Sequence, residues 1–187
     1  MEQDKTSRNE VIMAGIGGMG VLVAGQVLIW AALSQYKHVS YTPSYGTARR
    51  GGLSECTVIF SNNKIASPLL DQAQTVMLFD SSQFKSFETR VRPGGIIIAE
   101  KAGLNADRQR EDYKLHLLPC MEIAVGIGER MISNLIMLGA YATITGSISP
   151  ELIEAELHRR YIDKDKVLAR NLDAFKHGLG LGATSVS

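Results

Sequence analysis

Apolar runs and helix-spaced apolar positions alternate along this chain. Short continuous apolar runs between turn residues predict buried strands, whereas longer segments with apolar residues at helical spacing predict helices. We expect strands at 10–16, 38–42, 53–60, 74–80, 96–100 and 113–120, and helices at 19–35, 81–91, 121–127, 133–145, 149–161 and 164–178. This order predicts an α/β fold: a three-layer αβα sandwich, Rossmann-like, with a mostly parallel sheet.

Two stretches refine this expectation. Residues 53–60 alternate in polarity, and the SNN before KIA at 61–66 is a hairpin signal, so this part is expected to be antiparallel within the sheet. The last helix is expected to stop at Gly178, with 1–9 and 179–187 as flexible ends around a core of about 10–178. We therefore expect a single domain over residues 1–187.

The first helix has no polar face. From Met19 to Leu33 the apolar run is interrupted at three positions, Gly20, Gly25 and Gln26, which is typical of a helix buried on all sides. One side is expected to meet the sheet. Either a second chain or the C-terminal helices of the same chain would cover the other.

Composition and charge exclude several classes of protein. The 187 residues are 45% hydrophobic and carry a net charge of +1 with 6% aromatic content, which gives nucleic-acid binding no electrostatic support. No segment approaches the length of a membrane span, and the charged first residues do not resemble a secretory signal, so we expect a cytoplasmic protein. Cys56 and Cys120 lack a CxxC partner, which favours two buried thiols over an iron–sulfur or zinc site.

A glycine-rich turn follows the first expected strand. Gly15, Gly17 and Gly20 have the spacing G-x-G-x-x-G between a strand and a helix, where backbone N–H groups can approach an anion. Close packing of strand against helix explains the spacing equally well. A dinucleotide site would also need a carboxylate near the end of the second strand, and none occurs between Gly20 and Glu55.

A second loop, PSYGTARRGG at 43–52, carries an aromatic ring and two guanidinium groups between glycines. Tyr45, Arg49 and Arg50 suit a carboxylate or phosphate and the face of an adenine. The alternative is a solvated loop whose arginines pair with carboxylates. We expect this loop to lie beside the glycine turn.

The remaining candidate residues favour structural roles. Asp80 and Asn134 precede or begin expected helices, where capping is the simplest interpretation. His38, His116, His158 and His177 fall in separate elements without ligand spacing. The order of residues supports neither a catalytic constellation nor a metal site.

Four segments, GIGGMG, PSYGTARRGG, ISNLIMLGA and TGSISPELIEAEL, occur in an order and separation that resemble the gamma subunit of 2-oxoacid:ferredoxin oxidoreductases. The likeness spans roughly Val11 to Gly178, and Pro-Ser-Tyr-Gly followed by Arg-Gly-Gly is its most particular part. The resemblance implies a subunit, inactive alone, of a complex that converts a 2-oxoacid such as 2-oxoglutarate or pyruvate to an acyl-CoA.

The resemblance also implies where the cofactors and partners lie. Thiamine diphosphate, Mg and iron–sulfur clusters are expected on alpha and beta subunits, with or without a delta subunit, and ferredoxin is an indirect partner. This chain has no Asp-Gly dipeptide and no cysteine cluster for those groups. It is expected to share the coenzyme A site, whose candidate residues here are Gly15, Gly17, Gly18, Gly20, Ser44, Tyr45, Gly46, Arg49 and Arg50.

Two departures from the family pattern bear on that site. Met19 stands where much of the family has glutamine, and Thr47 and Ala48 stand where it has Pro-Glu. The alternatives are the small subunit of an indolepyruvate-type oxidoreductase, which lacks Pro-Ser-Tyr-Gly, and a free-standing nucleotide-binding oxidoreductase. A homodimer is an alternative assembly for the isolated chain.

Overall fold

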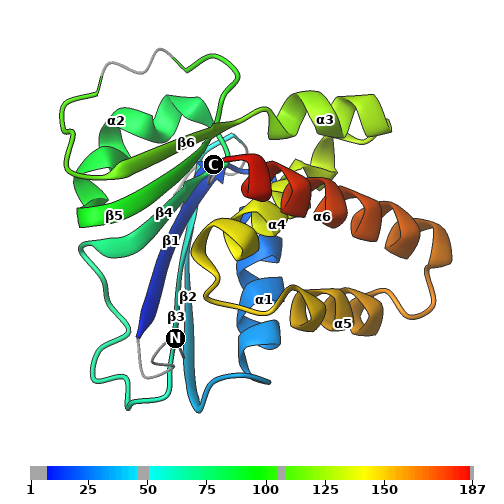
Figure 1. Cartoon of the computed structure of the whole chain (residues 1–187), viewed down its shortest axis with the longest axis horizontal. Helices are drawn as coiled ribbons and strands as arrows, with labels where there is room; N and C mark the ends of the chain where they lie inside the picture. Colours follow the sequence, from blue (N-terminus) through cyan, green and yellow to red (C-terminus); the bar gives the residue numbers. More distant parts are fainter. Residues whose placement is uncertain (1–7, 46–50, 105–107, 186–187) are drawn as a thin grey trace.

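A six-stranded mixed sheet forms the centre of the molecule (Figure 1). The computed structural model describes residues 8–45, 51–104 and 108–185. The strands are β1 (Asn9–Ile16), β2 (His38–Tyr45), β3 (Leu53–Ser61), β4 (Ala73–Leu78), β5 (Val91–Glu100) and β6 (Lys114–Leu118). The helices are α1 (Val21–Ala32), α2 (Phe84–Phe87), α3 (Cys120–Ile127), α4 (Ser133–Thr145), α5 (Pro150–Arg160) and α6 (Asp165–Ser185), with 3₁₀ turns η1 (Ser81–Gln83), η2 (Glu88–Arg90) and η3 (Arg130–Ile132).

The strand order is β2-β3-β1-β4-β5-β6. β1, β4, β5 and β6 pair in parallel, whereas β3 runs antiparallel to both β1 and β2. The expected antiparallel part of a mostly parallel sheet is therefore confirmed, but its hairpin is not at 61–66. Residues 62–72 lead from β3 to β4 without forming a strand, and the strand next to β3 in the sequence that pairs with it antiparallel is the preceding one, β2.

Helices cover both faces of the sheet, as the sandwich prediction requires. Side chains of β1 alternate between two cores: Val11 and Met13 pack on the side of α1 and α4, and Ile12 and Ala14 pack on the side of α2. Figure 1 shows the asymmetry of the layers, with α1, α4, α5 and α6 on one face and the short α2 on the other. Burial on both faces explains why β1 reads as a continuous apolar run.

The edge position of β2 explains one error in the predicted boundaries. Residues 43–45 were expected in a loop, yet β2 continues through Pro43 to Tyr45 and pairs with β3. A proline has no N–H for a sheet ladder, so it is tolerated on an edge strand. β2 pairs with β3 alone, which leaves its other side unpaired in the described sheet.

The prediction that the last helix stops at Gly178 is wrong. α6 continues to Ser185, and Gly178 lies inside the helix where it crosses α4. A Cβ at Gly178 would lie 2.0 Å from the carbonyl oxygen of Ile136, so the missing side chain permits close helix packing rather than a helix end. Residues 179–185 are consequently helical and not a loose end.

α1 is covered by helices of its own chain on the side away from the sheet. α4 and α5 both contact it, and eight of its residues are buried. Trp30 is nevertheless 50% exposed, so the expectation of a helix buried on every side is wrong for one stripe of α1. Within the described residues, no helix is both long and apolar enough to traverse a membrane.

Candidate ligand-binding site

The glycine turn lies at the carboxyl edge of the parallel strands. Gly15 belongs to the end of β1, while Gly17, Gly18 and Gly20 form the turn into α1. The neighbouring parallel strand β4 leads instead to α2, on the opposite face of the sheet. Ligands of open α/β sheets bind where consecutive connections diverge in this way.

The two candidate loops touch one another, as the sequence predicts. The N–H of Gly17 donates to the carbonyl of Gly52 at 2.8 Å, and the N–H of Met19 donates to that of Ile16 at 3.1 Å, which closes the glycine turn. The geometric reason is that Gly52 precedes β3, which runs antiparallel to β1 and therefore begins where β1 ends. Residues from both loops can consequently contact one ligand.

Gly20 has a conformation and a neighbour that exclude other residues. Its φ is +73°, in the left-handed region that favours glycine. Its carbonyl accepts hydrogen bonds from the N–H of Ala24 and from Asn134 Nδ2, both at 3.0 Å. A Cβ at Gly20 would lie 2.4 Å from that Nδ2 atom. The amide of Asn134 therefore fixes the turn from the side of α4.

This role of Asn134 corrects the expectation that it caps its own helix. The residue before α4 is Ile132, followed directly by Ser133, and no side chain caps this end. Asn134 is instead buried and directed at a carbonyl 114 residues earlier in the sequence. Asp80, by contrast, does cap η1, because its carboxylate accepts from the N–H of Ser82.

The N-terminus of α1 presents backbone N–H donors. Within the described residues, neither a capping side chain nor an acidic residue lies in its first turn. The first N–H groups of a helix lack internal partners and carry the positive end of the helix dipole, so they can donate hydrogen bonds to an anion. Apart from its chain neighbours, no atom of the described residues lies within 4 Å of the position that a Cβ of Gly18 would occupy.

The second loop is described at its two ends. Ser44 is exposed on β2 and lies opposite Glu55 in register, and the backbone of Tyr45 pairs with Ser54. Glu55 is bound to Arg90, with Nη1 and Oε1 2.5 Å apart. Gly46, Thr47, Ala48, Arg49 and Arg50 lie outside the described residues. Glu55, the first carboxylate after the glycine turn in the sequence, is thus already paired with Arg90.

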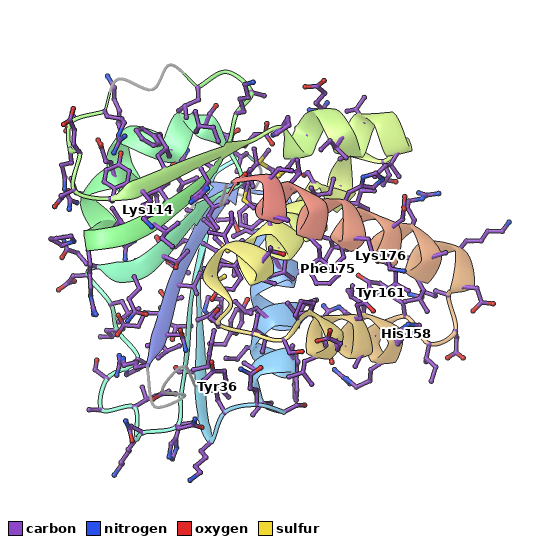
Figure 2. All side chains as sticks on the ribbon, viewed as in Figure 1. Tyr36, Lys114, His158, Tyr161, Phe175 and Lys176 are labelled. Carbon is purple, nitrogen blue, oxygen red and sulfur yellow. The ribbon has the colours of Figure 1, made fainter. Side chains whose placement is uncertain are left out.

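A pocket of about 270 Å³ lies beside Gly20, between α1, α4 and the start of α6. Its walls are mostly apolar, and Arg170 and Glu129 stand 3.4 Å apart among its polar residues. The residues that line it are Gly20, Val23, Glu129, Met131, Ile132, Asn134, Leu135, Tyr161, Val167, Arg170 and Asn171. Figure 2 labels Tyr161, which directly follows α5.

Sequence reasoning missed this pocket. Its residues come from four separate segments, and apart from Gly20 of the glycine turn they belong to no ligand-binding motif. Met131, which is 54% exposed, is an apolar side chain at the surface directly before the buried run that starts at Ile132, but exposure cannot be read from the sequence. Two of the quoted segments reach this wall: GIGGMG through Gly20, and ISNLIMLGA, at 132–140, through Ile132, Asn134 and Leu135.

The two cysteines are buried, and His158 and His116 lie far apart (Figure 2). Cys56 and Cys120 are free and buried, which confirms the prediction for both. Burial raises the pKa of Cys56 to about 12, with a further contribution from Glu55, and raises that of Cys120 as well. Figure 2 shows His158 far from β6, which carries His116. The described residues include no cluster of three or more potential metal ligands.

Comparison with known proteins places these features in a family. Residues 10–181 match the family described as pyruvate ferredoxin/flavodoxin oxidoreductase. The ketoisovalerate oxidoreductase subunit VorA of Methanothermobacter marburgensis is 33% identical over 170 residues, which are 90% of this chain but 35% of that protein. The chain therefore spans about a third of the length of this relative.

Another relative has nearly the same size as this chain. The 2-oxoglutarate synthase subunit KorC of Methanocaldococcus jannaschii is 29% identical over 150 residues, covering 79% of this chain and 80% of that protein. These relatives are subunits of oxidoreductases.

A solved structure shares the fold. It is that of 2-oxoglutarate:ferredoxin oxidoreductase from Magnetococcus marinus with 2-oxoglutarate, coenzyme A and succinyl-CoA bound. The TM-score is 0.86 at 21% identity, over 95% of this chain and 31% of the other.

Proposed function

Because the chain belongs to the pyruvate ferredoxin/flavodoxin oxidoreductase family, we propose that it is the gamma subunit of a thiamine-diphosphate-dependent 2-oxoacid:ferredoxin oxidoreductase. The similarity to KorC, which is itself a 2-oxoglutarate synthase subunit, supports this proposal. Thiamine diphosphate, Mg and the iron–sulfur clusters belong to the alpha and beta subunits in this proposal. Ferredoxin receives electrons from the complex and does not contact this chain.

We further propose that the chain contributes to the coenzyme A site. The observation that carries this proposal is the hydrogen bond between Gly17 and Gly52, because it joins the uncapped start of α1 to the loop that contains Arg49 and Arg50. Backbone N–H groups and guanidinium groups are the donors that phosphates prefer. The Magnetococcus marinus enzyme, which shares this fold, was solved with coenzyme A bound.

Each part of the site has a defined task in this proposal. The turn at Gly18 and the first N–H groups of α1 hold phosphate oxygens, and Arg50 neutralises their charge. The apolar pocket beside Gly20 takes the less polar arm of the ligand. Coenzyme A supplies the thiol that accepts the acyl group, so these residues orient a substrate and do not act on the reacting atoms.

Met19 bears on the strength of this site. The thioether of methionine cannot donate a hydrogen bond, whereas an amide can. Met19 packs against the larger apolar core of the described residues. Replacing Met19 with glutamine is therefore expected to lower the Michaelis constant for coenzyme A if the amide reaches the ligand, and to leave it unchanged if Met19 serves packing alone.

The test of the proposal is the kinetics of Arg50→Ala in the assembled complex. Loss of a charge-assisted contact to phosphate is expected to raise the Michaelis constant for coenzyme A about tenfold or more, while decarboxylation to the thiamine adduct continues. Arg159→Ala is the matched control, because Arg159 lies on α5 and is hydrogen-bonded to Glu156. An unchanged Michaelis constant for Arg50→Ala would remove this loop from the coenzyme A site.

A further inference from the structure

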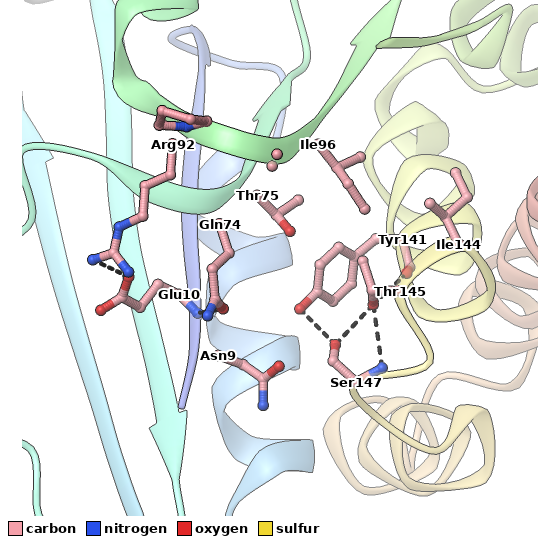
Figure 3. A pocket seen from close by; sticks show the side chains of 13 residues that line it. Asn9, Glu10, Gln74, Thr75, Arg92, Ile96, Tyr141, Ile144, Thr145 and Ser147 are labelled. Carbon is pink, nitrogen blue, oxygen red and sulfur yellow. Dashed lines mark hydrogen bonds and ion pairs between the residues drawn. The ribbon is translucent and has the colours of Figure 1, made fainter. Parts of the chain in front are cut away.

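A second pocket lies at the opposite edge of the sheet from the glycine turn. It has a volume of about 400 Å³ and is formed where β1, β4 and β5 begin, against the end of α4 (Figure 3). Its wall combines amide, hydroxyl and charged side chains with the apolar side chains of Ile96 and Ile144. The size lies within the range of small-molecule sites.

An irregularity in β5 builds one wall of this pocket. Ala73 pairs with Val91 and Thr75 pairs with Ile96, so residues 92–95 bulge out of the ladder between β4 and β5. The bulge places Arg92 at the pocket. The N–H of Gly94 donates to the carbonyl of Asp112 at 2.6 Å, and this hydrogen bond fixes the bulge. Bulges of this kind commonly redirect a side chain toward a site.

Arg92 contacts a buried carboxylate. Glu10 is 2% exposed, and its Oε2 lies 2.6 Å from Arg92 Nη2, without the angle of a hydrogen bond. Its Oε1 accepts from Arg8 Nε at 2.5 Å. Two guanidinium groups thus face one carboxylate, which leaves an excess of one positive charge. Within the described residues, Arg92 Nε and Nη1 have no partner.

Gln74 adds a further donor to the pocket, beside a cluster of hydroxyls. Gln74 accepts from the N–H of Glu10 at 3.3 Å through Oε1, and its Nε2 has no partner among the described residues. Figure 3 shows Gln74 between the Glu10–Arg92 pair and a cluster of hydroxyls on α4 and the residues after it. In that cluster, Ser147 Oγ lies 2.8 Å from both Tyr141 Oη and Thr145 Oγ1.

We propose that this pocket binds a small organic carboxylate. Its carboxyl group meets Arg92, the amide of Gln74 and the hydroxyl of Thr75, and its short carbon chain packs on Ile96 and Ile144. A cation is disfavoured, because Glu10 is already paired with two arginines. An inorganic phosphate would satisfy the donors but would leave the apolar wall in contact with water.

This site is independent of the proposed function. It lies at the edge of the sheet away from the glycine turn, and its lining shares no residue with the pocket beside Gly20. Its test measures binding to the purified chain and uses neither coenzyme A nor turnover.

The experiment is a calorimetric titration of the full chain with sodium butyrate, sodium succinate and inorganic phosphate at constant ionic strength. We expect saturable binding of a carboxylate that is tighter than that of phosphate. Arg92→Gln is expected to weaken carboxylate binding about tenfold or more, since a hydrogen bond to a charged group is lost. Arg159→Gln is the matched control, because Arg159 also pairs with a largely buried glutamate, and it should leave binding unchanged.

Thr75→Val provides a second variant of nearly the same shape. Thr75 is 5% exposed, and removing its hydroxyl is expected to weaken carboxylate binding severalfold without unfolding the chain. The proposal is overturned if no carboxylate binds saturably, if phosphate binds as tightly as both carboxylates, or if Arg92→Gln and Thr75→Val bind like the unmodified chain.

Discussion

The interaction between Gly20 and Asn134 can be tested by a double-mutant cycle. Gly20→Ala forces an alanine to a φ of +73°, which costs about 1–2 kcal/mol. The added Cβ would lie 2.4 Å from Asn134 Nδ2 and would displace the amide from its hydrogen bond, which costs about 1 kcal/mol more. We therefore expect the free energy of unfolding to fall by about 2–3 kcal/mol.

Gly51→Ala separates the two contributions. Gly51 has the same φ of +73°, and apart from its chain neighbours no atom of the described residues lies within 4 Å of its added Cβ, so we expect the conformational cost of about 1–2 kcal/mol alone. In the Asn134→Ala background, Gly20→Ala should likewise cost about 1–2 kcal/mol, because the clashing amide is absent. The assay is urea unfolding followed by circular dichroism and by the fluorescence of Trp30.

Two outcomes of the double-mutant cycle would contradict the role assigned to Asn134. If Gly20→Ala destabilises no more than Gly51→Ala, or if its cost is the same with and without Asn134, then the amide does not hold the glycine turn. A coupling free energy of about 1 kcal/mol between the two positions is the expected outcome.

Two further predictions concern the packing of α4 on α6 and the buried thiols. Gly178→Ala should lower the free energy of unfolding by about 3 kcal/mol, because its Cβ would meet the carbonyl of Ile136. Gly180→Ala, on the same helix but without a described atom within 4 Å of its Cβ, should raise the free energy of unfolding by about 0.5–1 kcal/mol. Thermal unfolding of both variants measures the difference, and equal effects would contradict the close crossing of α4 and α6. Burial raises the pKa of Cys56 from 9.0 to about 12, so between these pH values the folded chain keeps the thiol proton while the unfolded chain loses it. The free energy of unfolding should therefore fall as the pH rises from 9.0 to about 12. Urea midpoints at pH 8 and pH 11 should differ less for Cys56→Ala than for the unmodified chain, and an equal difference would refute burial of the thiol.

The sequence was sufficient to predict the fold because its central strands are buried on both sides. β1 and β4 are mostly buried on both faces, so each contains a short apolar run, at 11–14 and 76–78, that is visible in the sequence whatever strands lie beside it. The antiparallel direction of β3 was also predicted, although the hairpin was assigned to the wrong end of that strand. Strand pairing depends on partners distant in sequence, which a local turn signal does not identify.

Glycine and asparagine were the residues most open to misinterpretation. Gly178 follows a helical pattern, and either a helix end or a close helix crossing explains a glycine there. Asn134 begins a helix, where capping is the usual role, but its partner Gly20 is 114 residues away. The adjacency of the glycine turn and the second loop was predicted correctly, because both were assigned to the same edge of the sheet.

The pockets could not be predicted from local patterns. The hydroxyls of Thr145 and Ser147 follow an apolar helix and read as an ordinary helix end. Arg92 precedes Pro-Gly-Gly, which reads as a turn, and its contact with Glu10 depends on the bulge between β4 and β5. Such sites arise from segments that converge only in the folded chain.

The most direct test of the central claim measures 2-oxoacid-dependent reduction of ferredoxin, with coenzyme A present, by the chain alone and by the chain copurified with alpha and beta subunits. The proposed division of tasks predicts no turnover by the isolated chain and coenzyme A-dependent turnover by the complex. Turnover by the isolated chain, or full activity of alpha and beta subunits without it, would contradict the claim.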